Sequence, residues 1–143
     1  MIKIPRAFIG WEVLVIDDES DNLEVASRLL RLGGATVVVA SDGQQALEIV
    51  RTHPTLFKVI LSDLSMPAMD GWEVLYLLKQ DPRMHTVPVI ALTAHAMQGD
   101  RERGLAADFH NYITKPIDPT HFIQQLITIL IDIPEYAEHL KTF

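Results

Sequence analysis

Cysteine is absent from the 143 residues of the sequence. Its absence excludes disulfide bonds and metal sites built from thiolates. Apolar residues make up 48% of the chain, which is ordinary for one globular domain with one core. We therefore expect a single domain over residues 1–143, with its core at 12–131, a short lead at 1–11 and a frayed tail at 132–143.

Basic residues are scarce, and so are long apolar runs. The chain has 12 lysines and arginines against 19 acids, and the resulting net charge of -7 disfavours a nucleic-acid partner. The uncharged segment 119–131 contains histidine and glutamine and is far shorter than the ~20 apolar residues of a membrane-spanning helix. The amino-terminal segment MIKIPRAFIGW lacks the apolar core and the cleavage site of a signal peptide. We therefore expect a cytoplasmic protein that binds neither membranes nor nucleic acid.

Short runs rich in valine and isoleucine alternate with longer segments of helical period. The expected strands are 13–16, 36–40, 59–61 continuing into 62–63, 89–93 and 112–114. Buried parallel strands have this composition, and the alternation is typical of βα units around a parallel sheet. Right-handed crossovers then give an α/β fold in which helices cover both faces of a doubly wound sheet.

Five helices are expected between and after these strands, at 21–32, 43–51, 71–79, 98–106 and 119–131. Asp42 and Asp70 precede two of them and are expected to cap their first turns. Gly33 and Gly34 are expected to end the first helix, since glycine readily adopts the left-handed backbone of a helix stop. The last helix is apolar over more than one face, which leaves the tail or a second copy of the chain as partner for its outer side.

The ends of four expected strands carry acidic, hydroxyl or basic side chains. These residues are Asp17 and Asp18 after the first strand, Asp63 at the third, Thr93 at the fourth and Lys115 after the fifth. Ligands of open parallel sheets bind beyond the carboxyl ends of the strands. A single aspartate at a strand end is most often a helix cap or a loop residue, so only the five positions together indicate a site. We expect them to meet at one edge of the sheet.

Carboxylates that cluster in this way favour a bound cation. Two unit charges about 4 Å apart interact by roughly 4 kcal/mol at an effective dielectric constant of about 20. Mg²⁺ fits better than Zn²⁺, because it prefers oxygen ligands and no cysteine or histidine stands at the strand ends. Lys115 would add a positive charge, and Thr93 would donate a hydrogen bond to a phosphoryl oxygen. Asp63 is the best candidate nucleophile, whereas the adjacent Asp17 and Asp18 are better suited to hold the metal.

Five motifs in order along the chain resemble those of one protein family. They are VLVIDDE, ASDGQQAL, VILSDLSMPAMDGWEVL, VPVIALTAHAM and YITKPI. The sequence resembles the receiver domain of bacterial two-component response regulators, and specifically the stand-alone kind, since few residues follow Leu130. The resemblance implies a flavodoxin-like receiver fold with five parallel strands in the order 2-1-3-4-5. It also implies phosphoryl transfer to Asp63 from a histidine kinase or a phosphotransfer protein.

The resemblance also assigns a metal site. It implies that Asp18, Asp63 and the main-chain carbonyl of Ser65 bind Mg²⁺, with Asp17 acting through metal-bound water. The protein would then be a phosphoacceptor that undergoes magnesium-dependent phosphorylation and dephosphorylation, and not an enzyme acting on other substrates.

The resemblance further implies a conformational switch. Phosphorylation adds negative charge, which would draw Thr93 and Lys115 toward the phosphoryl group. Tyr112 would then swing inward behind Thr93 and change the surface that a downstream protein contacts. The peptide bond between Lys115 and Pro116 would be cis.

Two other classes of function stay open on the residues themselves. One is a magnesium-dependent phosphohydrolase with Asp63 as nucleophile, which would need a second acid close behind it and a cap over the substrate; Ser65 occupies the second position instead. The other is a nucleotide-binding or structural module of the same architecture. The absence of a glycine-rich phosphate loop after the first strand weakens nucleotide binding.

Overall fold

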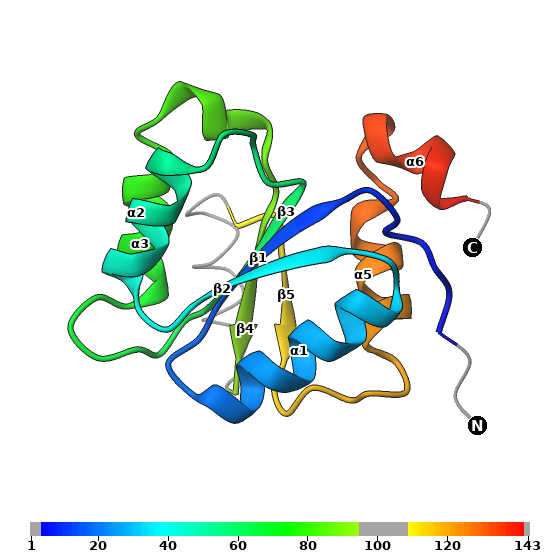
Figure 1. Cartoon of the computed structure of the whole chain (residues 1–143), viewed down its shortest axis with the longest axis horizontal. Helices are drawn as coiled ribbons and strands as arrows, with labels where there is room; N and C mark the ends of the chain where they lie inside the picture. The colour runs from blue at the N-terminus through cyan, green and yellow to red at the C-terminus, as the bar shows by residue number, and fades with distance from the viewer. Residues whose placement is uncertain (1–3, 95–108, 142–143) are drawn as a thin grey trace.

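A five-stranded parallel sheet forms the centre of the protein. The computed structural model describes residues 4–94 and 109–141, and its strands lie in the order β2-β1-β3-β4-β5 (Figure 1). The strands are β1 (Glu12–Ile16), β2 (Thr36–Ala40), β3 (Val59–Asp63), β4 (Val89–Thr93) and β5 (Asn111–Thr114). This order confirms the doubly wound α/β fold that the sequence indicated.

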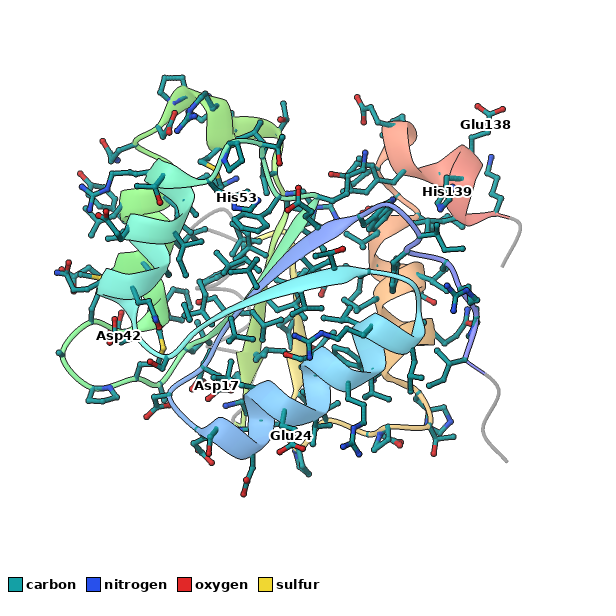
Figure 2. All side chains as sticks on the ribbon, in the orientation of Figure 1. Asp17, Glu24, Asp42, His53, Glu138 and His139 are labelled. Atoms are coloured by element: carbon teal, nitrogen blue, oxygen red, sulfur yellow. The ribbon has the colours of Figure 1, made fainter. Side chains whose placement is uncertain are left out.

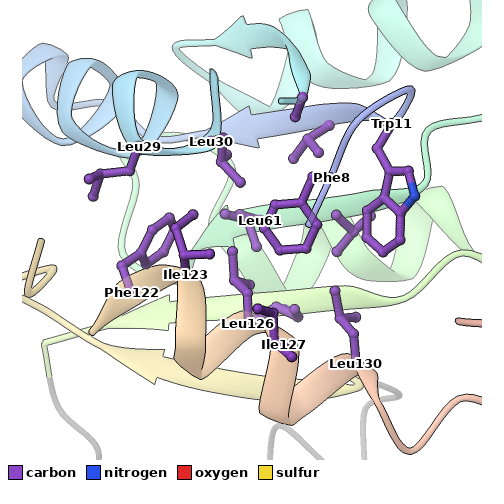
Figure 3. Packing of buried hydrophobic residues seen from close by; sticks show 14 of the residues in the cluster. Phe8, Trp11, Leu29, Leu30, Leu61, Phe122, Ile123, Leu126, Ile127 and Leu130 are labelled. Carbon is purple, nitrogen blue, oxygen red and sulfur yellow. The ribbon is translucent and has the colours of Figure 1, made fainter. Parts of the chain in front are cut away.

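Helices cover both faces of the sheet. They are α1 (Ser20–Leu32), α2 (Gly43–Thr52), α3 (Gly71–Leu78), the 3-10 helix η1 (Pro82–Thr86), α5 (Phe122–Leu130) and α6 (Pro134–Leu140). One buried cluster joins α1 and α5 to one face of the sheet through Leu30 and Phe122 (Figure 3), and a second joins α2 and α3 to the other face through Val50 and Leu78. The helix expected at 98–106 lies outside the described residues. None of the described helices has the length and apolar character needed to cross a membrane.

The parallel register brings the strand ends to one edge of the sheet. Ile16 at the end of β1 pairs with Ser62 in β3, and Asp63 pairs with Leu92 in β4. All residues of β3 and β4 are buried, which explains why these runs show no alternation of apolar and polar residues. The residues that follow β1, β3 and β4 therefore lie next to one another in space.

Two helix starts follow the expected capping residues. The Asp42 carboxylate accepts a hydrogen bond from the Gln45 amide at 2.7 Å, and the Asp70 carboxylate accepts one from the Glu73 amide at 3.0 Å. Gly34, the second residue after α1, has φ of 101°, which confirms the expected left-handed stop. These three boundaries are set by local chemistry that the sequence displays.

The start of α5 differs from the expectation. The helix begins at Phe122 and not at Pro119. The Asp118 carboxylate accepts a hydrogen bond from the Thr120 amide at 3.0 Å and lies 2.6 Å from His121 Nδ1. Because this side chain binds the backbone just after it, the chain makes a turn before the helix starts.

The 3-10 helix η1 is an element that the sequence pattern did not indicate. It begins at Pro82, and the Asp81 carboxylate accepts a hydrogen bond from the Arg83 amide at 2.9 Å. The Lys79 ammonium donates to the main-chain carbonyl of Met84 at 2.9 Å. An element this short cannot show a helical period in its sequence, so its prediction would have required these contacts.

The tail is not frayed: it forms α6, which packs against the amino-terminal lead. The Trp11 ring centroid lies 5.2 Å from that of Tyr136 and 5.9 Å from that of His139. The Tyr136 hydroxyl donates to the Lys58 carbonyl at 2.7 Å, and His139 Nε2 lies 2.6 Å from the Ala7 carbonyl oxygen. We call these five residues the terminal clasp.

The terminal clasp extends the core beyond the expected limits of 12–131. Phe8 and Leu140 are buried in the same cluster as α1 and α5, and Figure 3 shows Phe8 and Trp11 beside the side chains of α5. A single short helix has little stability by itself, so α6 depends on partners from the other end of the chain. A local sequence pattern could not show those partners.

The surplus apolar surface of α5 is covered within the chain. The buried residues of α5 are Phe122, Ile123, Leu126, Ile127 and Leu130, and they belong to the cluster that contains Tyr136 and Leu140. The exposed residues of this helix are Gln124, Gln125 and Thr128. The tail, as α6, thus packs in the same cluster as α5, and contact of this helix with a second copy of the chain stays a prediction.

Replacing Tyr136 with phenylalanine tests the terminal clasp. Tyr136→Phe keeps a ring against Trp11 but removes the donor to the Lys58 carbonyl, so the free energy of unfolding should fall by about 1 kcal/mol. Urea unfolding followed by tryptophan fluorescence measures this change. Tyr76→Phe is the matched control, because Tyr76 is 65% exposed, and it should change the stability by less than about 0.5 kcal/mol. Equal losses in the two variants would contradict the role of the clasp.

Candidate functional site

Three carboxylates meet at the carboxyl edge of the sheet. Asp17 and Asp18 follow β1, Asp63 ends β3, and one oxygen of each lies within 4.8 Å of the other two. Asp17 is fully buried and Asp63 is 3% exposed, whereas Asp18 faces solvent. Figure 2 shows Asp17 at the end of the sheet beside the start of α1. The structure thus brings together the acids that the sequence analysis selected.

Hydrogen bonds to the main chain fix the two buried acids. The Asp17 amide donates to the Ala40 carbonyl at 3.1 Å, and Asp17 Oδ1 accepts from the Glu19 amide at 3.0 Å. Asp63 Oδ1 accepts from the Ser65 amide at 3.2 Å. Each carboxylate is therefore oriented by the turn that follows its own strand.

Lys115 places its ammonium between the two buried acids. Lys115 Nζ lies 2.8 Å from Asp17 Oδ2 and 3.2 Å from Asp63 Oδ1, and the side chain is 11% exposed. The Lys115 amide donates to the Thr93 carbonyl at 2.7 Å, which ties the residue to the end of β4. The peptide bond between Lys115 and Pro116 is cis, as the family resemblance implied.

The charges in this cluster do not balance. When ionised, the three carboxylates carry three negative charges, and the Lys115 ammonium supplies one positive charge. A divalent cation would offset the remaining two. Carboxylate oxygens are ligands that Mg²⁺ accepts readily, and one member of the set faces solvent, where a partly hydrated ion could enter. The residues present therefore fit a magnesium site.

Burial raises the pKa of the Asp63 carboxyl from 3.8 to about 6, and the nearby charge of Asp17 acts in the same direction. The Lys115 ammonium and the Ser65 amide act in the opposite direction but are outweighed. Burial alone would lower the pKa of Lys115, yet its contacts with Asp17 and Asp63 raise it. Asp63 therefore changes its charge close to neutral pH, whereas Lys115 stays positively charged.

The other expected residues surround this cluster. Thr93 is 7% exposed at the end of β4 and pairs with Thr114 of β5. Tyr112 is half-buried in β5 and packs against the cluster of α2 and α3. Ser65 is exposed in the turn after Asp63. The expected site residues thus lie at the carboxyl edge of the sheet, except Tyr112, which lies within β5.

The loop after Asp63 depends on residues that the sequence analysis did not assign to the site. A Cβ atom on Gly71 would collide with the Asp63 carbonyl oxygen, so the close approach requires glycine. The Gly71 amide donates to the Leu64 carbonyl at 3.0 Å and closes the loop. Ala68 has φ of 66°, in the left-handed region that favours glycine. The one local signal for Gly71 was its place directly after the capping residue Asp70.

The raised pKa of Asp63 predicts that stability depends on pH. The folded protein keeps a proton on Asp63 up to about pH 6, whereas the unfolded chain releases it near pH 3.8. The Asp63 contribution to the free energy of unfolding should therefore decrease as the pH rises between these values. Asp63→Asn removes the titrating group and should stabilise the protein at neutral pH, by at most about 3 kcal/mol, with little effect at low pH.

Urea unfolding of wild type and Asp63→Asn at several pH values, with EDTA present, measures this difference. Asp21→Asn is the matched control, since Asp21 is an exposed acid in the first turn of α1. Parallel pH profiles for wild type and Asp63→Asn would show that the carboxyl is not perturbed in this way.

Comparisons with known proteins agree with this fold. Residues 13–127 match the response regulator receiver domain. The chain is 40% identical over 110 residues to the signal transduction histidine-protein kinase BarA of Escherichia coli, a match that covers 77% of this chain and 12% of BarA. It is 36% identical over 121 residues to the polar-differentiation response regulator DivK of Brucella ovis, covering 84% of this chain and 96% of DivK.

Solved structures show the same relationship. The chemotaxis response regulator CheY4 of Vibrio cholerae superposes with a TM-score of 0.78 at 28% identity, covering 84% of this chain and 98% of CheY4. The sequence match spans most of the chain, and the strand order is the one that the family resemblance implied. The chain therefore belongs to the family of response regulator receiver domains.

Proposed function

We propose that this chain accepts a phosphoryl group on Asp63 from a histidine kinase or a phosphotransfer protein. Phosphoryl acceptance is the general function of receiver domains. The observation that carries the proposal is the setting of Asp63, a buried aspartate at the end of a central strand, 3.2 Å from the Lys115 ammonium and close to Asp17.

Asp63 acts as the nucleophile in this proposal. Its Oδ1 accepts the Ser65 amide and faces Lys115, so we assign the attack on phosphorus to Oδ2. A new bond joins Oδ2 to phosphorus, and the bond between phosphorus and the donor's leaving atom breaks. A pKa of about 6 leaves the carboxylate mostly ionised at neutral pH, as nucleophilic attack requires.

We assign the Mg²⁺ site to four groups, the carboxylates of Asp17, Asp18 and Asp63 and the main-chain carbonyl of Ser65. Receiver domains generally bind this ion at an acidic pocket, and the unbalanced charge of the cluster supports the same assignment here. When bound, Mg²⁺ neutralises charge on the carboxylates and on the phosphoryl oxygens. The Lys115 ammonium, already at the site, would bind a phosphoryl oxygen by a charge-assisted hydrogen bond.

Thr93 and Tyr112 are the proposed switch residues. The Thr93 hydroxyl would donate to a phosphoryl oxygen, which would draw this residue toward Asp63. Tyr112 lies on the neighbouring strand and is half-buried, so its ring could pack farther inward when Thr93 moves. A hollow of about 420 Å³ between β5 and α5 is lined in part by Tyr112 and Gln125. We propose that this surface changes shape for a downstream protein.

The names of two relatives support the class of partner. BarA is named as a histidine-protein kinase and DivK as a response regulator. We propose that the phosphoryl donor and the downstream target are proteins, and that both contacts occur in the cytoplasm, where phosphoryl transfer can draw on ATP. The net charge of -7 disfavours a nucleic-acid partner.

A magnesium-dependent phosphohydrolase with Asp63 as nucleophile is the alternative. Such an enzyme needs an acid close after the nucleophile and a cap over the substrate. Ser65 stands two positions after Asp63, and the described connections that follow β1 and β3, at 17–19 and 64–70, are too short to form a cap. These features favour the phosphoacceptor.

Acetyl phosphate with Mg²⁺ tests the proposed function. Intact mass spectrometry should show one stoichiometric phosphoryl adduct in wild type and none in Asp63→Asn. Asp21→Asn is the matched control and should keep the adduct, since Asp21 is exposed on α1. Steady hydrolysis of added phosphomonoesters would favour the phosphohydrolase. Absence of both adduct and turnover would reject both functions.

We expect no dimer through α5, because α6 and the core already cover the apolar side chains of this helix. Size-exclusion chromatography with multi-angle light scattering, with and without beryllofluoride, measures the mass in both states. Monomeric mass throughout is the expected result. A dimer that is lost when charges replace Gln124 and Thr128 would show that the exposed face of α5 is an interface.

A further inference from the structure

Two adjoining hollows lie at the amino ends of β3, β4 and β5. One has a volume of about 580 Å³ and the other of about 660 Å³. Thr86, Val87 and Ile133 line both, so we treat them as one depression and call it the amino-end groove. Figure 1 shows η1 and α6 at this end of the sheet, and Figure 2 places Asp17 at the opposite end. The groove is therefore separate from the acidic cluster.

The floor of the amino-end groove is apolar. Phe57, Val87 and Phe109 are buried among its lining residues, and Leu56 is 44% exposed at its side. A concave site of several hundred Å³ with an apolar floor and a few polar groups is typical of small-molecule binding. Ile133 lies beyond residues 13–127, so one wall of the groove is formed outside the part of the chain that matches the receiver family.

The basic side chains that line the groove outnumber the acidic ones. The lining residues include two lysines, Lys58 and Lys79, two histidines, His85 and His110, and one acid, Glu135. A second acid, Asp132, lies 2.9 Å from His110. The lysines make the lining of the groove positive, whereas the net charge of the whole chain is -7. A locally basic wall on an acidic protein favours a negatively charged ligand.

Two of these basic groups are held in place by the protein. The Lys58 ammonium lies 4.9 Å from the ring centroid of Tyr136, and the Lys79 ammonium donates to the Met84 and Val87 carbonyls, each at 2.9 Å. A ligand would meet side chains that are already ordered, which lowers the entropic cost of binding.

We propose that the amino-end groove binds a small organic anion with an apolar body. The apolar part would pack against the exposed side chain of Leu56, and the charged group would face the basic wall. His110 is paired with Asp132 at 2.9 Å, so we assign the ligand's charge to the two lysines, Lys58 and Lys79. This site does not depend on phosphoryl acceptance at Asp63.

Thr86 provides a test, because it is exposed and lines both hollows. The probe is anilinonaphthalene sulfonate, an apolar organic anion. Thr86→Lys should tighten its binding about fivefold and Thr86→Glu should weaken it about fivefold, as expected for one charge about 4 Å away in water. Fluorescence titration measures the Kd, and chemical shift changes in the ¹⁵N-labelled full chain locate the probe.

Gln44→Lys and Gln44→Glu are the matched controls, since Gln44 is exposed on α2, and both should leave the Kd unchanged. Asp63→Asn should also bind normally, which separates this proposal from the proposed function. If Thr86→Glu does not fold, Thr86→Lys provides the test by itself. The proposal then requires that this variant bind the probe with a lower Kd than wild type, and that its Kd rise with the salt concentration. Unsaturable binding, shift changes centred outside the groove, or the same response to both charges at Thr86 would overturn the proposal.

Discussion

The ion pairs that Lys115 makes with Asp17 and Asp63 are the contacts on which the site depends. Two carboxylates buried at the ends of neighbouring strands repel each other, and the ammonium between them, 2.8 Å and 3.2 Å away, offsets part of this repulsion. The same contacts tie the chain after β5 to β1 and β3. Burial, together with the charge of Asp17 that Lys115 offsets only in part, keeps the pKa of Asp63 high. The negative charge that remains favours a further cation.

The two ends of the sheet have different roles in this fold. The carboxyl edge concentrates negative charge, whereas part of the amino end is covered by aromatic packing and hydrogen bonds of the terminal clasp. Tyr136 binds the carbonyl of Lys58, directly before β3, and Asp63 is the last residue of the same strand. The clasp thus stabilises, from the far end, the strand that holds the proposed phosphoryl acceptor.

Elements defined by local chemistry were predictable from the sequence. The valine-rich runs gave β2 and β4 with the expected bounds, because a β-branched run between polar turns has few other stable conformations. The caps at Asp42 and Asp70 were predictable for the same reason. The start of α5 was not, because the hydrogen bonds of Asp118 compete with the helix.

The sequence by itself determined the sheet, its edge and the identity of the acids at that edge, because parallel strands place their carboxyl ends together whatever packs around them. Only the tertiary structure decided the ion-pair geometry of Lys115, the close approach at Gly71 and the folding of α6. Each of these depends on atoms from segments far apart in the chain. No single segment carries their signal, since the contact exists only after the segments have packed.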